Sequence, residues 1–277
     1  MKINLWGVRG SIQTSGPETK NYGTRTSCIY LSDADHVLIL DAGTGIQQFN
    51  SINFGEKRID VLLTHLHMDH ILGLGFFNPF FDPEMEVHIW GPKIKSETLR
   101  SRLSRYLSPP LFPVLLRDLP CKLVFHEIGN SDFQINNFKI VSNYVIHPGP
   151  TVGFRVTGRN SVFTYIPDHE PALGCDGMIR DPKWMSGFNL ASEADLLYHD
   201  GQYTRQEYKS KRGWGHSCID DSLLFASICR AKNLIIAHHD PSHSDEDLSR
   251  IYADILSKPR GHFNCQMAEE GKEFDLG

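Results

Sequence analysis

The amino-acid sequence predicts a layered α/β fold, and two features of its first third carry this prediction. Residues 37–40 and 61–63 are continuous apolar runs, and a strand without alternating polar positions is typically buried on both faces. A glycine-rich turn over 41–45 follows the first run and opens a segment of helical character. Buried strands that alternate with helices along the chain are typical of α/β layers.

The remaining elements continue this pattern. A basic helical segment ends at residues 109–113, where three prolines prevent the helix from continuing. Beyond it, apolar runs rich in β-branched and aromatic residues resume. No repeat, low-complexity tract or long linker separates the elements, so we expect one domain over residues 1–277 with two α/β halves. We expect strands at 2–6, 27–31, 37–40, 60–63, 87–90, 121–127, 138–146, 151–157, 161–166, 195–198 and 233–237, and helices at 45–53, 92–108, 219–231 and 245–257.

Composition excludes several classes of protein. With 28 Lys and Arg against 33 Asp and Glu, the net charge of −5 does not suit nonspecific coating of nucleic acid. The most apolar stretch, 71–81, is short and interrupted by Gly and Pro, so we expect no membrane span and no signal peptide. Six scattered cysteines without a CxxC pair favour reduced thiols in a cytoplasmic protein. The unusual count is 14 His, since histidine is the commonest metal ligand and the usual proton shuttle.

The strongest local signal is a His- and Asp-rich segment that begins where the apolar run 61–63 ends. It places His65, His67, Asp69 and His70 at the C-terminal edge of a buried strand, where open α/β sheets locate their sites. Imidazole and carboxylate together suit zinc, manganese or iron. The segment therefore predicts a metal site.

This HxHxDH pattern resembles the metallo-β-lactamase superfamily, and the resemblance implies an αββα sandwich of two β-sheets flanked by helices. That superfamily carries a further His, a bridging Asp and a last His, each at a strand end. His147, Asp168 and His238 stand in this order, each after apolar strand-type residues. The resemblance implies two divalent metal ions, with zinc expected and manganese or iron as alternatives. One ion would be held by His65, His67 and His147 and the other by Asp69, His70 and His238, with Asp168 bridging both.

The last of these ligands has a neighbour that competes for the same role, because His239 follows His238. Neighbouring residues of a strand point to opposite faces, so only one of the two can ligate. We expect His238, because it directly follows the apolar run 235–237, and we expect His239 to lie at the rim.

Two later segments resemble motifs of the ribonuclease Z-like phosphodiesterases within that superfamily. Residues 194–200 (ADLLYHD) resemble one motif and residues 215–217 (GHS) resemble the motif that follows it, and the whole resemblance covers about residues 1–245. Two places in the sequence depart from the family pattern. In the first motif, Asp200 stands where that family has Glu, and Gln202 and Tyr203 replace its small residues. Pro167 stands where a Gly usually precedes the bridging Asp.

The resemblance implies roles in phosphate chemistry. His199 is the expected proton donor to the leaving alkoxide, positioned by Asp200 or by Asp69, and a general acid of this kind contributes about 10²–10⁴-fold. His216 is expected near the phosphate, as a donor or as a support. Ser217 and His243 are further expected substrate contacts, and Ser217 is also placed to cap the helix that begins near residue 219.

The size of the substrate depends on the basic segment 93–105. Members that process tRNA carry a protruding arm rich in glycine and basic residues, and this segment offers a basic helix but no Gly-rich arm. We therefore expect a small phosphodiester or nucleotide, with a 3′,5′-cyclic nucleotide as the best guess, and extended nucleic acid is less expected. The alternatives are a ribonuclease Z-like RNA 3′-end nuclease and a thioester or lactone hydrolase on the same fold. A homodimer fits the family.

The glycine-rich N-terminal loops leave two interpretations open. Either the loops cover the metal pocket and Arg9 or Arg25 contacts a phosphate, or they are hairpin turns whose arginines face solvent.

Overall fold

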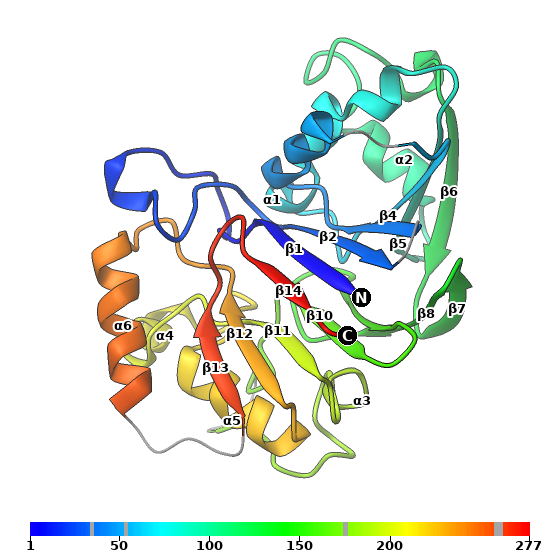
Figure 1. Cartoon of the computed structure of the whole chain (residues 1–277). Coiled ribbons are helices and arrows are strands. Elements are labelled where there is room, and N and C mark those ends of the chain that lie inside the picture. The colour runs from blue at the N-terminus through cyan, green and yellow to red at the C-terminus, as the bar shows by residue number, and fades with distance from the viewer. Residues whose placement is uncertain (34–35, 53–54, 174–176, 258–262) are drawn as a thin grey trace.

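The computed structural model of the chain is an αββα sandwich (Figure 1). It describes residues 1–33, 36–52, 55–173, 177–257 and 263–277, so the predicted thiol Cys175 lies outside the described residues. Two β-sheets pack face to face, and helices cover their outer faces. The predicted fold class is confirmed.

The first sheet is built from the N-terminal half, completed at its edge by a C-terminal strand. Strands β3 to β6 run parallel, as expected for buried apolar runs joined by helical crossovers. In spatial order the seven strands of this sheet are β14 (Glu273–Asp275), β1 (Lys2–Gly7), β2 (Cys28–Asp33), β3 (His36–Leu40), β4 (Arg58–Leu62), β5 (Glu86–Pro92) and β6 (Lys122–Ile128).

The second sheet repeats this plan with the rest of the chain. Strands β10 to β13 run parallel and β7 to β10 are antiparallel. In spatial order its seven strands are β13 (Asn264–Met267), β12 (Asn233–Ala237), β11 (Leu196–Asp200), β10 (Val162–Ile166), β9 (Val152–Thr157), β8 (Phe138–Tyr144) and β7 (Ser131–Ile135).

Side-chain alternation along the strands divides the apolar residues between three cores. Leu38 and Leu40 of β3 face the core between the sheets, whereas Ile39 faces the helices outside. On β12, Ile235 faces the inner core and Ile236 the outer one. This is why the predicted strands read as unbroken apolar runs.

The helices lie where the crossovers carry the chain over the outer faces of the sheets. Residues of α1 and α2 pack on the first sheet, and residues of α3, α5 and α6 pack on the second. Among the described residues, none of the helices combines the length and the apolar character needed to cross a bilayer. The α-helices are α1 (Met68–Ile71), α2 (Leu99–Ser104), α3 (Phe188–Ala191), α4 (Arg205–Lys211), α5 (Ile219–Cys229) and α6 (Asp245–Ser257).

Two predicted helices differ from the structure. The helix expected over 92–108 is shortened to α2, because the Thr98 side chain accepts from the Ser101 backbone N–H and starts the helix there. The segment expected as a helix over 45–53 is a 3₁₀ helix, Thr44–Ser51, with residues 53 and 54 outside the described part. The short elements β7, β13, β14, α1, α3 and α4 were not expected from the sequence.

Candidate metal centre

The first sheet contributes the His-rich segment, which follows β4 and leads into α1 (Met68–Ile71). The Thr64 hydroxyl donates to the Asp41 carboxylate at 2.9 Å, so its oxygen accepts from His65 Nδ1 at 3.0 Å. His70 Nδ1 donates to Asp41 Oδ2 at 2.7 Å. Because both Nδ1 atoms are engaged, His65 and His70 present Nε2 to the cluster.

The second sheet contributes residues from three strand ends. His147 follows β8 and donates from Nδ1 to the Gly215 carbonyl at 2.7 Å, which leaves its Nε2 as the acceptor. Asp168 follows β10, and His238 follows β12 with a left-handed φ of 60°. The N-terminal loop packs against the His238 ring so closely that a Cβ on Gly10 would lie 2.3 Å from its Nδ1.

These side chains converge at the seam between the sheets. His67 Nδ1 lies 3.2 Å from His147 Nε2, and His238 Nε2 lies 3.2 Å from Asp69 Oδ2. Asp168 stands between the two pairs, with Oδ2 3.0 Å from His70 Nε2 and Oδ1 3.3 Å from His238 Nε2. Five sets among the described residues have ligand atoms within 4.8 Å of one another, and His216 belongs to two of them. The sets are His65, His67 and His147; Asp69, His70 and His238; His65, His70 and Asp168; His147, Asp168 and His216; and Asp200, His216 and His238.

The charges of the cluster favour a bound cation. Burial disfavours the anions, but His238 and His70 nonetheless hold the pKa of Asp168 well below its usual range. Burial lowers the pKa of His65 well below its ordinary value and that of His147 to about 4, so both rings are neutral ligands near pH 7. Burial disfavours the charged form of His70, but the neighbouring carboxylates of Asp168 and Asp69 outweigh this effect and raise the pKa of His70 well above its ordinary value. The site thus attracts positive charge.

The donor set fits a divalent metal. His65 Nε2 is buried and lacks a hydrogen-bond partner within the described part of the chain, although it points at the cluster. An orphaned buried nitrogen is costly unless a further partner binds it. Imidazole nitrogens supported through their other ring nitrogen, together with carboxylates, are the usual ligands of zinc, manganese and iron.

A hydrogen-bonded pair of side chains lies beside the cluster. His216 Nδ1 donates to Asp200 Oδ2 at 2.8 Å and lies 3.8 Å from Asp168 Oδ1. Asp200 is fully buried, and it also accepts backbone N–H groups from His169 at 3.0 Å and Gln202 at 3.0 Å. Asp200 is therefore held by backbone and fixes both the tautomer and the orientation of His216.

His199 lies elsewhere. Its Nδ1 donates to the Asp200 carbonyl at 2.8 Å, its Nε2 contacts His169 Nδ1 at 3.0 Å, and its ring stacks on Phe225. His199 is a residue of β11, and its side chain is fully buried against α5. This burial lowers the pKa of His199 to about 4. With both ring nitrogens engaged away from the cluster, His199 does not have the position expected of a proton donor, and Asp200 orients His216 instead.

The other predicted contact residues have structural partners. The Ser217 hydroxyl donates to the His169 carbonyl at 2.6 Å, and Cys218 is the N-cap of α5, so the predicted Ser217 cap is wrong. His243 Nε2 lies 2.8 Å from Glu207 Oε1. His239 Nε2 donates to the Ala268 carbonyl at 2.9 Å, so His238 and not His239 reaches the cluster.

The two N-terminal arginines bind protein groups. Arg9 is fully buried and donates to the carbonyls of Gly23 at 2.8 Å and His243 at 2.7 Å. Arg25 pairs with the Glu270 carboxylate. Neither guanidinium is directed to the cluster of His and Asp side chains, so both arginines stabilise the fold around that cluster.

Replacing Arg9 with methionine is expected to lower the free energy of unfolding by about 3 kcal/mol, because buried carbonyl groups lose a charged donor. Urea unfolding at constant metal concentration measures this loss. The half-exposed Arg25→Met is the control and should cost less than about 1 kcal/mol. An Arg9→Met protein of unchanged stability but weakened phosphate binding would instead favour the phosphate-contact interpretation.

Two residues that support the site were not predicted. Asp41 has a positive φ of 59° and orients both His65, through Thr64, and His70. Glu170 accepts from the Gly213 and Gly215 N–H groups at 2.8 and 2.7 Å and so holds the loop before His216. The sequence did point to Asp41, because this residue follows a buried strand and precedes a Gly-rich turn. Glu170 had only its position two residues after Asp168.

Comparison with known proteins agrees with this geometry. A family model described as "Beta-lactamase superfamily domain" matches residues 36–239. A ribonuclease Z of Nanoarchaeum equitans is 23% identical over 92% of this chain and 88% of its own length. Among solved structures, the short form of human tRNase Z has a TM-score of 0.68 at 20% identity, with each chain covered completely. A diphosphatase from the PhnP family has a TM-score of 0.68 at 17% identity, covering 99% of this chain and 96% of that one. The chain belongs to the metallo-β-lactamase superfamily and is a metal-dependent hydrolase.

Proposed function

We propose that this protein is a binuclear metal-dependent phosphodiesterase that hydrolyses a small phosphodiester, with a 3′,5′-cyclic nucleotide as the first candidate. The observation that carries the proposal is the Asp200–His216 pair beside Asp168. A carboxylate-oriented imidazole next to the His/Asp cluster suits protonation of a leaving alkoxide, which thioester hydrolysis does not require because a thiolate leaves readily without a proton.

The proposed ligands follow the two separate sets of converging side chains. One ion would be held by His65, His67 and His147 and the other by Asp69, His70 and His238, with Asp168 between them; zinc is the first candidate, manganese or iron the second. A bound metal pair supplies a nucleophile at neutral pH and neutralises charge on the phosphoryl oxygens.

In this proposal His216 replaces His199 as the proton donor. Because Nδ1 of His216 is held by Asp200, Nε2 is the nitrogen left to face the leaving oxygen. Two further rings define its position: His238 stacks on it with centroids 4.9 Å apart, and His147 meets it edge-on at 5.1 Å. In this proposal Asp69 is a metal ligand and does not position the proton donor. Its Oδ2 accepts from the Ser11 N–H at 2.7 Å and lies beside His238.

The second candidate is RNA 3′-end processing, which the ribonuclease Z relatives favour. A small substrate is our first choice because the structure offers a short α2 in the basic segment and the sequence offers no Gly-rich arm. The homodimer and the cytoplasmic location stay predictions, and light scattering tests the first of them.

A hydrolysis screen of the metal-loaded protein separates these candidates. It compares 3′,5′-cyclic mononucleotides, bis-p-nitrophenyl phosphate, a tRNA precursor and a thioester. We expect hydrolysis of the first two. Activity confined to the tRNA precursor would contradict the small substrate, and activity confined to the thioester would contradict the phosphodiesterase itself.

A further inference from the structure

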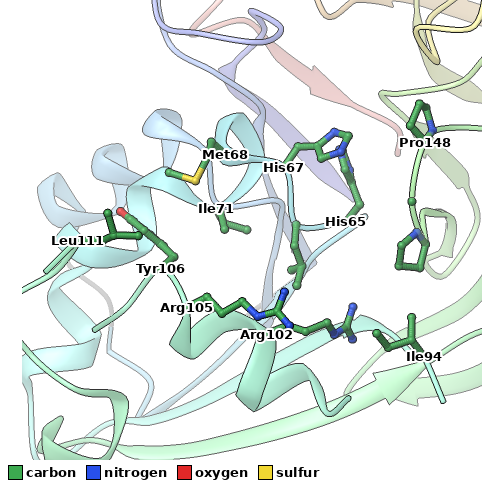
Figure 2. Close-up of a pocket in the computed structure, with 13 residues that line it drawn as sticks. His65, His67, Met68, Ile71, Ile94, Arg102, Arg105, Tyr106, Leu111 and Pro148 are labelled. Atoms are coloured by element: carbon green, nitrogen blue, oxygen red, sulfur yellow. The ribbon is translucent and has the colours of Figure 1, made fainter. Parts of the chain in front are cut away.

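An apolar cavity of about 380 Å³ opens directly beside the metal cluster. His65 and His67 form one wall, and the segment around α2 forms the opposite wall (Figure 2). A group bound here would therefore be attached to a phosphate seated at the cluster. A volume of this size suits a small organic group.

The lining is apolar apart from a few groups. Figure 2 shows Tyr106 and Leu111 at one end and Ile94 and Pro148 at the other. Tyr106 is held by its own hydroxyl, which donates to the Leu72 carbonyl at 2.6 Å, so its ring is a fixed part of the wall. Such a lining favours a flat, largely apolar ligand.

Arg102 gives the cavity a buried polar donor. Its side chain is only 9% exposed; one terminal nitrogen donates to the Pro92 carbonyl, and that nitrogen lies 4.0 Å from Glu127. Its Nε is buried and has no hydrogen-bond partner among the described residues. A buried donor without an acceptor is destabilising, so a ligand that brings an acceptor to Nε removes this penalty once the guanidinium turns toward the cavity.

We propose that this cavity is a base pocket, which takes the nucleobase of a nucleotide phosphodiester and pairs a base carbonyl or ring nitrogen with Arg102 Nε. The inference rests on the proposed phosphodiesterase function and adds the place where the nucleobase of such a substrate binds. A nucleobase combines a flat apolar face for Tyr106 with acceptor atoms at its edge. An aliphatic group of the same size would leave Arg102 Nε unpaired.

Two chromogenic esters with the same leaving group test the base pocket. Thymidine 5′-(p-nitrophenyl phosphate) carries a base, methyl p-nitrophenyl phosphate does not, and both release p-nitrophenol. We expect kcat/KM to be at least about tenfold higher for the thymidine ester. Arg102→Met should remove about tenfold of this advantage through KM, which is measured as the ratio of kcat/KM between the two esters.

Three further variants keep the test independent of folding defects. Leu111 is 70% exposed at the mouth, so Leu111→Trp should fold and should raise KM for the thymidine ester alone by narrowing the pocket. Arg102→Lys keeps the charge without the Nε donor and should behave like Arg102→Met. Arg100→Met, on the exposed side of the same helix, is the matched control and should change neither ester.

The outcomes separate the two proposals. Equal kcat/KM for the two esters, or equal losses for both in the Arg102 and Leu111 variants, would overturn the base pocket and leave the phosphodiesterase standing. Hydrolysis of neither ester would overturn the phosphodiesterase and the base pocket with it.

Discussion

Replacing Asp168 with alanine is expected to abolish binding of a metal pair and to lower phosphodiesterase activity by at least about 10³-fold. Asp168 lies 3.0 Å from His70 Nε2 and 3.3 Å from His238 Nε2, and 3.9 Å from Nε2 of both His65 and His147. Without its carboxylate, the two sets of histidines face each other with no anion between them. Elemental analysis of the purified variant should therefore find fewer than two metal equivalents per chain.

The matched control for this experiment is a second buried carboxylate outside the cluster. Asp221 is 5% exposed and pairs with Arg205 at 2.7 Å, so Asp221→Ala should lose stability and keep both metals. If Asp168→Ala still holds two metal equivalents, Asp168 is not the bridging residue.

Replacing His216 with asparagine is expected to lower kcat by about 10²–10⁴-fold, the usual contribution of a positioned general acid. The loss should be large for a cyclic nucleotide, whose leaving alkoxide needs a proton, and smaller for a p-nitrophenyl ester, whose leaving phenolate does not. Metal content should stay unchanged, because neither proposed ligand set includes His216. A loss of the same size on both substrates would contradict the acid role.

The companion variant His199→Ala tests whether His216, which the structure favours, or His199, which the sequence predicted, is the proton donor. Because His199 packs on Phe225 and bonds to His169, we expect lower stability with kcat largely retained. A folded His199→Ala protein with the larger loss in kcat, beside an active His216→Asn, would restore His199 as the donor.

The predicted ligands could be found from sequence because each carries a local signal. His65 to His70 are contiguous, and His147, Asp168 and His238 each follow an apolar run that becomes a strand of the second sheet. The choice of His238 over His239 also had a local signal, because His238 directly follows the apolar run that becomes β12. The strands β8, β10 and β12 run in the same direction in the second sheet, so the residues that follow them lie along one edge of it, where they meet the segment that follows β4 of the first sheet.

The assignment of the proton donor could not be made in this way. His199 and Asp200 are adjacent, which suggests a pair, but their side chains point to opposite sides of β11. The partner of Asp200 is His216, whose position depends on the Gly213 and Gly215 N–H groups bonding to Glu170. Such a contact across 45 residues has no local sequence signal.

The missed strands have a different cause. β13 and β14 are four and three residues long, and each lies at an edge of its sheet, so neither forms the extended apolar run of a central strand. Within the described part of the chain β7 pairs with β8 alone, and its exposed positions are polar. Edge strands depend on a partner already in place, which sequence patterning reports poorly.

The position of the cluster at the seam couples metal affinity to the integrity of the whole molecule. His65 and His70 are carried by the first sheet, whereas Asp168 and His238 are carried by the second. A cation bound by residues of both groups would join two halves that each have their own outer core. Free metal at 100 times its dissociation constant would then add about 2.7 kcal/mol to the stability of the closed sandwich. Removal of the metal would therefore weaken the association of the two sheets and also abolish hydrolysis.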